Sequence, residues 1–222
     1  MKKWSLLIVL LLSACQLETE ETRQPVEPST PVTEEQQPDT NEPSTPAEEE
    51  TVVDLHDYFL PNQSSAQFEG MGNEYATFTL KTQHLYEDYV GTYEDNGGTV
   101  MQRIYRIEDE RIVMILEEAE AYDADFPPLS ELEALPEIET YLSLPIEEGT
   151  EFNGWTITAI DQTIDTPLQT FDHVFVLSQE GADQSVVERY FAEGFGEIKR
   201  VFRMPGGEGE EYEVTSTIAS LE

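Results

Sequence analysis

The sequence predicts a mainly β domain, which is an antiparallel twisted meander sheet or half-barrel with a short helical insertion. Three observations support this fold class. From residue 52 onward, aromatic and β-branched residues appear together, and all twenty Phe and Tyr residues lie in this part. Apolar residues recur there mostly at every second position, as in half-buried strands. The alternating segments are short and are separated by turn residues, which is typical of an antiparallel meander. Strong twist or partial closure would protect its edge strands.

Nine strands are expected in this part of the chain. Asn96-Gly97, a strong hairpin signal, separates the second from the third. The fourth is a continuous apolar run, consistent with a central strand. In the fifth, Trp155 and Ile157 alternate with threonines, so we expect Trp155 in the core. The expected strands are residues 74–80, 85–93, 99–107, 111–116, 155–160, 173–178, 186–192, 197–204 and 212–218.

One segment breaks the alternation. Ser130-Glu131-Leu132-Glu133 has the spacing of a capping box, in which Ser130 and Glu133 satisfy each other's free backbone amides. Pro136 limits any helix here to a turn or two. We therefore expect residues 126–142 to form a short helical insertion or lid between two halves of the sheet.

Two glycines flank an aromatic residue near the end of the chain. Gly194 and Gly196 allow a turn between the two expected strands on either side. Phe195 between them is expected to plug the end of the sheet. Contact between this loop and a ligand is the alternative.

Residues 1–14 look like the signal peptide of a bacterial lipoprotein. Lys2 and Lys3 form a positive start, and a short apolar run follows at residues 4–12. Leu12-Ser13-Ala14-Cys15 then resembles a lipobox, and Cys15 is the only cysteine of the 222 residues. The run is shorter than the roughly 20 residues needed to span a bilayer. The alternative is an ordinary secretory signal with an incidental cysteine.

By this resemblance, Cys15 becomes the mature N-terminus and carries a diacylglycerol that anchors the protein at the extracytoplasmic face of the cell membrane. Residues 15–51 then form a lipidated, disordered tether. Its residues 16–51 hold six prolines, eleven acidic residues, one basic residue and no aromatic residue, a composition that cannot form a packed core. Residues 52–222 suit one extracytoplasmic domain, which contains no cysteine and hence no disulfide.

Several segments of this domain resemble a recurrent, uncharacterised all-β module of Gram-positive surface lipoproteins and other secreted proteins. The match runs from residue 55 to residue 218 and consists mainly of turn glycines and core aromatics in a fixed order. The resemblance implies an extracytoplasmic β domain and carries over no catalytic residue. The matching segments are DYFLP (57–61), FEG (68–70), GNEYA (72–76), EDNGGT (94–99), Pro145 with Gly149 and Trp155, DTP (165–167) and RYFAEGFGEIK (189–199).

No motif in the chain points to a catalytic or metal centre. His56, His84 and His173 are far apart and form no H-E-x-x-H pair. The chain lacks G-x-S-x-G, S-x-x-K and glycine-rich phosphate loops, and with Cys15 lipidated no cysteine remains as a nucleophile. We therefore assign no catalytic residue, no metal ligand and no cofactor.

The abundant carboxylates leave two alternatives open. A pair of them could serve glycoside hydrolysis, although abundance removes the diagnostic value of any one pair. Asp123 with Asp125, or Glu94, Asp95 and Asn96, could ligate Ca²⁺, although neither set has EF-hand spacing. A solvated acidic surface is the favoured explanation of both sets.

The charge of the chain is strongly negative, at −36. Residues 52–222 carry 36 acidic and eight basic residues, or −28, which disfavours nucleic acid as a partner. Solubility outside the cell explains this charge, and attraction to a basic partner or to cations is the alternative. Crowded carboxylates also predict that added salt and mild acidification both stabilise the domain.

Together these features favour a non-enzymatic, lipid-anchored envelope protein that binds a protein, a wall component or an amphipathic ligand. A lipid carrier is a more specific version, and it requires a concave apolar face beneath residues 126–142. A carboxylate-dependent hydrolase and a cation-responsive acidic domain are the alternatives.

Overall fold

Twelve antiparallel strands form one continuous sheet in residues 53–207 and 210–222, the part of the chain that the computed structural model describes. This confirms the mainly β, antiparallel fold class. The elements in order are η1 (Leu55–Tyr58), β1 (Ser64–Met71), β2 (Phe78–Tyr86), β3 (Tyr89–Asp95), β4 (Val100–Ile107), β5 (Arg111–Glu118), α1 (Leu129–Leu132), β6 (Glu139–Ser143), β7 (Glu151–Phe152), β8 (Trp155–Asp165), β9 (Thr170–Glu180), β10 (Val186–Ala192), β11 (Gly196–Pro205) and β12 (Glu211–Leu221).

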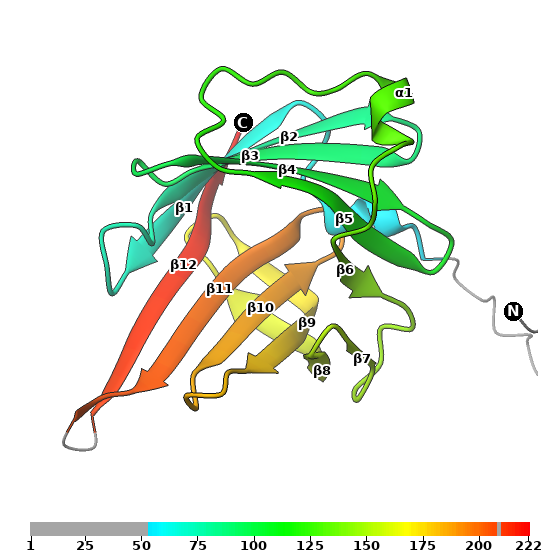
Figure 1. Cartoon of the computed structure of the whole chain (residues 1–222). Coiled ribbons are helices and arrows are strands. Elements are labelled where there is room, and N and C mark those ends of the chain that lie inside the picture. The colour runs from blue at the N-terminus through cyan, green and yellow to red at the C-terminus, as the bar shows by residue number, and fades with distance from the viewer. Residues whose placement is uncertain (1–52, 208–209) are drawn as a thin grey trace, which may run out of the picture. The chain divides into compact units, whose positions relative to one another are not determined.

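The strand order is β6-β5-β4-β3-β2-β1-β12-β11-β10-β9-β8-β7, so the first and last strands pair in the middle of the sheet. We call β1–β6 the first half and β7–β12 the second half. Figure 1 shows the sheet curved until these halves face each other. The edges β6 and β7 are bridged by a side chain, since Asn153 Nδ2 donates to the Thr140 carbonyl at 3.4 Å. The sheet is therefore a nearly closed barrel.

The expected hairpin at Asn96-Gly97 is confirmed. Asn96 Oδ1 accepts hydrogen bonds from the amides of Gly98 and Thr99, both at 3.0 Å, and Gly97 has a φ of 77°. The strand expected at 85–93 is wrong, because β2 ends at Tyr86 and β3 begins at Tyr89. The turn between β2 and β3 consists of Glu87 and Asp88, and it contains no glycine, proline or asparagine that would indicate a turn in the sequence.

Two of the three apolar core clusters lie between the halves. The larger cluster joins η1 to both halves, and Trp155 belongs to it with 8% of its surface exposed, as expected. The smaller cluster gathers residues from β1 and β2 against β9, β10, β11 and β12. The most deeply buried large side chains of the two are Phe191, Ile112, Leu142, Ile157 and Leu177 in the larger and Leu60, Phe68, Ile198 and Ile218 in the smaller.

The insertion after β5 differs from expectation. The helix begins after Pro128, so Ser130 lies inside it and caps nothing, and residues 139–143 of the segment form strand β6. Leu132 is fully buried against Tyr89, Ile104 and Val113, on the face of the first half that points away from the second. The insertion is therefore no lid between the halves. By covering the outer face it explains why β5 reads as a continuous apolar run.

The predictions for residues 1–51 concern a part of the chain that the structure does not describe. The signal peptide, Cys15 and the tether lie outside the described residues and stay predictions. Among the described residues, no helix has the length and apolar character needed to cross a membrane.

Candidate functional site

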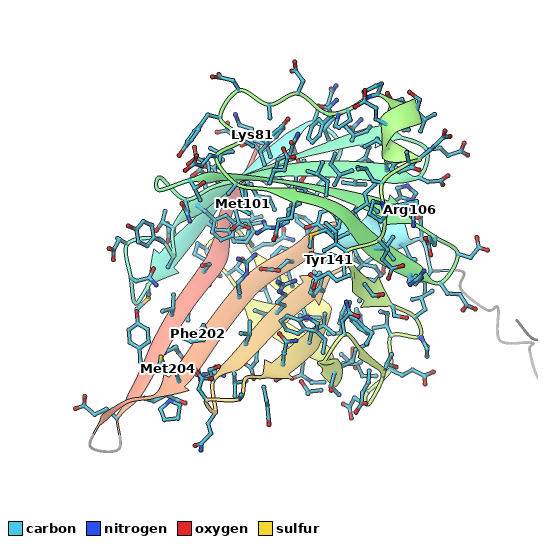
Figure 2. The ribbon with its side chains drawn as sticks, in the orientation of Figure 1. Lys81, Met101, Arg106, Tyr141, Phe202 and Met204 are labelled. Atoms are coloured by element: carbon cyan, nitrogen blue, oxygen red, sulfur yellow. The ribbon has the colours of Figure 1, made fainter. Side chains whose placement is uncertain are left out.

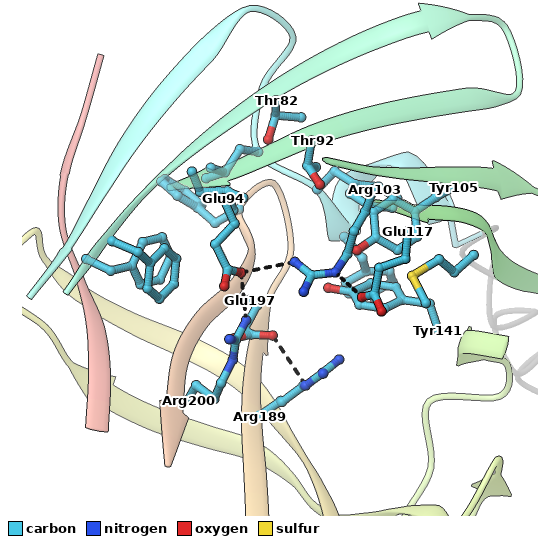
Figure 3. A pocket seen from close by; sticks show the side chains of 18 of the residues that line it. Thr82, Thr92, Glu94, Arg103, Tyr105, Glu117, Tyr141, Arg189, Glu197 and Arg200 are labelled. Atoms are coloured by element: carbon cyan, nitrogen blue, oxygen red, sulfur yellow. Dashed lines mark hydrogen bonds and ion pairs between the residues drawn. The ribbon is translucent and has the colours of Figure 1, made fainter. Parts of the chain in front are cut away.

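A cavity of about 100 Å³ lies between the two halves of the sheet. Three of the domain's six arginines line it, Arg103 from β4, Arg189 from β10 and Arg200 from β11. Glu94 from β3 and Glu197 from β11 lie among them, as Figure 3 shows. In a domain with so few basic residues, this concentration of arginines in the interior is the feature that most needs an explanation.

Ion pairs connect these groups across the cavity. Glu94 Oε2 accepts hydrogen bonds from Arg103 Nη1 and Arg200 Nη2, both at 3.3 Å. Arg200 Nε also donates to Glu197 Oε1 at 2.7 Å, and Arg103 Nε donates to Glu117 Oε2 at 2.7 Å. Because Glu94 belongs to the first half and Arg200 to the second, their bond joins the two halves of the sheet.

Glu94 is held ionised despite its burial. Its side chain is only 12% exposed, and this desolvation opposes the charge. The attraction of Arg200 and Arg103 outweighs the burial, so the pKa of Glu94 lies below its ordinary value. Burial alone would lower the pKa of Arg200. Its neighbours Glu197 and Glu94 raise this pKa by more than burial lowers it, so it lies above its ordinary value. Glu94 and Arg200 are therefore both charged at neutral pH.

The resolved pKa directions of the carboxylates run against the expectation that mild acid stabilises the domain. The carboxylates whose pKa the structure shifts, Asp54, Glu94, Glu108 and Asp183, are all shifted downward. A group with a lowered folded-state pKa adds stability above its unfolded pKa and loses it as the pH falls through the folded value. Acidification is therefore expected to remove stability at these sites.

Arg189 differs from the other arginines of the cluster. Its guanidinium lies 4.7 Å from the centre of the Trp155 ring and 5.8 Å from that of Tyr141. Its Nε is buried 3.6 Å from Glu197 Oε2 and has no hydrogen-bond partner among the described residues. The rings thus hold the guanidinium in position while its N–H groups stay unused.

Hydroxyl groups complete the polar lining. The rings of Tyr105 and Tyr141 pack at a tilt of 52° with their centres 4.7 Å apart, and neither hydroxyl bonds to a described residue. Burial raises the pKa of both phenols, so both remain protonated donors at neutral pH. Thr82, 3% exposed, also leaves its buried Oγ1 without a partner in the described part of the chain. Figure 2 shows Tyr141 in the space between the halves and Lys81 on the outside.

The remaining wall of the cavity is apolar. Phe68 and Phe78 stack there with ring centres 4.4 Å apart. Phe195 packs edge-on against Phe171 at 4.8 Å, which agrees with a structural role for this loop, and it also lines the cavity. Its turn depends on Gly196, which has a φ of 69° and would place a Cβ 2.5 Å from the Tyr58 carbonyl oxygen.

The lipid-carrier hypothesis does not agree with this geometry. It required an apolar concave face beneath residues 126–142, but the insertion packs on the outer face. The cavity between the halves is lined by charged and hydroxyl groups as well as apolar ones, and Phe78 takes up part of its wall. Its free volume is below that of a cavity of about 150 Å³ that holds benzene, so an acyl chain does not fit.

The two carboxylate alternatives also fare poorly. A glycosidase needs one protonated carboxyl as general acid, whereas Glu94 is held ionised between two arginines. The expected cation set is split, because Glu94 points into the cavity while Asp95 and Asn96 accept hydrogen bonds from their own turn. Among the described residues, no three His, Asp or Glu side chains are grouped to hold a metal, and Asp123 with Asp125 forms no such group.

The arginine cluster was missed at the sequence level, although a signal for it exists. Arg189 occupies a core-facing position between Val187 and Phe191, which pack on the larger cluster. Arg103 precedes Tyr105 on the same face of β4 in the same way. A charged residue at an apolar position of an alternating strand is therefore the pattern to look for.

Comparisons with known proteins identify no family for this chain. No protein-family model matches it, and no curated protein matches it. A solved structure described as an exported protein with a YmcC-like fold, from Bacteroides fragilis, shares 12% identity over 75% of this chain and 99% of its own, with a TM-score of 0.46. A structure described as a lipoprotein, from Parabacteroides distasonis, shares 9% identity over 74% of this chain and 98% of its own, with a TM-score of 0.44. At these TM-scores the likeness carries no functional argument, and the Gram-positive origin expected from the resemblance stays a prediction.

Proposed function

We propose that this protein is a lipid-anchored, non-enzymatic binding protein of the cell envelope, whose cavity between the sheet halves holds a small polar group of its ligand. Diacylglycerol on Cys15 anchors it at the extracytoplasmic face of the membrane, and the acidic, proline-rich residues 16–51 act as the tether. The ligand is an envelope protein, a wall component or an amphipathic molecule whose body remains outside the cavity.

One observation supports the binding site above the others. Two buried polar atoms that line the cavity, Arg189 Nε and Thr82 Oγ1, have no hydrogen-bond partner among the described residues. Buried polar groups without partners cost about 1–3 kcal/mol each, so a cavity that keeps two of them is suited to receive a partner or ordered water. A ligand group that satisfies them recovers that free energy on binding.

Native mass spectrometry of the full-length protein, purified from its own membranes, tests this proposal. Thr92, 5% exposed on β3, lines the cavity, so Thr92→Met fills it. Thr79→Met places the same side chain on the outside of neighbouring β2, where Thr79 bonds to Gln67. We expect a non-covalent mass adduct on the native protein and on Thr79→Met that is lost from Thr92→Met. An adduct that survives in Thr92→Met, or none on the native protein, contradicts a cavity-bound ligand.

A further inference from the structure

We propose that the group held in the cavity is an oxyanion, a carboxylate or a phosphate, received by Arg189 together with the hydroxyls of Tyr105 and Tyr141. This inference rests on the proposed function and narrows it to one ligand chemistry. It is carried by the unused donors of Arg189, by the way two aromatic rings position them, and by the size of the free space.

Hydrogen bonding separates Arg189 from every other arginine of the domain. Arg103, Arg106, Arg111, Arg200 and Arg203 each donate hydrogen bonds to one or two glutamates. Arg189 donates to no described residue, and its contact with Glu197 Oε2 is 3.6 Å, beyond hydrogen-bond length. In a chain with 47 acidic residues, an arginine left without a hydrogen-bonded carboxylate is unexpected.

The surroundings of Arg189 leave the N–H donors of its guanidinium available to a ligand. Contact with the faces of Trp155 and Tyr141 fixes the guanidinium without using any of its N–H groups. About a quarter of the side chain, 24%, is exposed, so solutes reach it from solvent. A planar fork of donors that is held rigid matches the paired oxygens of a carboxylate or phosphate.

The neighbouring hydroxyls point to the same chemistry. Tyr105 is only 6% exposed, and its ring packs at a tilt against Tyr141, whose ring faces Arg189. Both phenols are protonated at neutral pH, because burial raises their pKa. The group beside Arg189 therefore meets hydrogen-bond donors from both tyrosines, which suits a group with several acceptor oxygens.

Size argues against a bulkier polar ligand. The free volume of about 100 Å³ is smaller than the roughly 150 Å³ that accommodates benzene. A sugar ring with its hydroxyls exceeds that space, whereas a carboxylate or phosphate group is smaller. The rest of a larger ligand must remain outside, which agrees with the proposed binding of an envelope component by one end.

Charge predicts an unusual salt dependence for this site. The domain at −28 repels anions at long range, and dissolved salt screens this repulsion. The contact with Arg189 is largely buried, so salt screens it less. We therefore expect oxyanion affinity to rise when sodium chloride increases from about 10 mM to about 150 mM, the opposite of binding to an exposed arginine.

Thermal melting of the full-length protein in detergent tests the inference, with inorganic phosphate or acetate replacing chloride at constant ionic strength. We expect a saturable rise in Tm with at least one of these anions. Arg189→Gln should weaken that anion's affinity by roughly tenfold to hundredfold, because charge-assisted hydrogen bonds are lost. Arg203→Gln removes the same charge from β11 outside the cavity and should retain the affinity. Dihexanoyl phosphatidic acid, compared with free phosphate, distinguishes a lipid headgroup from a free ion.

Two milder variants keep the test valid if Arg189→Gln does not fold. Arg189→Lys keeps the charge but removes the planar fork, and Tyr105→Phe removes only a hydroxyl, so each should weaken the anion's affinity severalfold. A rise in Tm that is unsaturable, or is equal in all variants, overturns the oxyanion site. If no oxyanion binds but the cavity-dependent mass adduct persists, the ligand class is wrong and the proposed function stands. If the adduct is also absent, both fail.

Discussion

Replacing Glu94 with Gln tests whether the interior ion cluster holds the two halves of the sheet together. The substitution keeps the shape of the side chain and removes one charge between Arg103 and Arg200. Removing one partner of a buried pair costs about 3–5 kcal/mol. The arginines here are 21% and 33% exposed and each keeps a second glutamate, so we expect a loss nearer about 2–3 kcal/mol at pH 7.

Urea denaturation followed by Trp fluorescence measures this loss. With a slope of about 2 kcal/mol per M, the midpoint should fall by about 1–1.5 M. Because the pKa of Glu94 is lowered on folding, its contribution is complete well above the ordinary value of 4.5. The difference between native protein and Glu94→Gln should therefore shrink as the pH falls below 4.5 and vanish below the folded-state pKa.

Glu69→Gln is the matched control, because Glu69 is exposed on β1 and forms no ion pair with a described residue. Its removal should change stability by less than about 0.5 kcal/mol. If Glu94→Gln is as stable as Glu69→Gln at pH 7, the cluster does not join the halves and the reasoning fails.

Three further substitutions test the fold and the anchor. Trp155→Ala should cost about 3–5 kcal/mol through lost burial and a cavity, measured by urea denaturation, and a loss below about 1 kcal/mol would mean an exposed ring. Gly196→Ala should cost about 2 kcal/mol or more, because its φ is 69° and a Cβ meets the Tyr58 carbonyl. Gly194→Ala shares the positive φ but meets nothing within 4 Å, so its melting temperature should fall less; equal losses would refute the contact. Cys15→Ser should abolish incorporation of a clickable fatty acid, and persistent label would refute the anchor.

The sequence predicts the type of most elements because their segments are rich in aromatic and β-branched residues. The expected strand 186–192 coincides with β10, and 197–204 falls within β11. β1 was missed because only Ala66 and Phe68 among its eight residues are buried apolar side chains. The capping box failed because Pro128, with its fixed φ, sets the start of the helix ahead of Ser130.

The site could not be predicted because it depends on contacts between distant strands. Glu94 and Arg200 are 106 residues apart and meet only when the sheet curves. Periodicity identifies which face a side chain occupies, but not which face lies opposite. Glu94 could not be distinguished by sequence from the many other carboxylates of this acidic chain. The position of Arg189 between two core residues, in contrast, could have been recognised from the alternating pattern.

A crystal structure of the protein purified from its own membranes, at a resolution that distinguishes water from larger groups, tests the central claim most directly. We expect density larger than water in the cavity, bonded to the Arg189 guanidinium and to a tyrosine hydroxyl. Density for ordered water alone between Arg189, Tyr105 and Tyr141, in protein that has kept its native ligands, contradicts a binding site there.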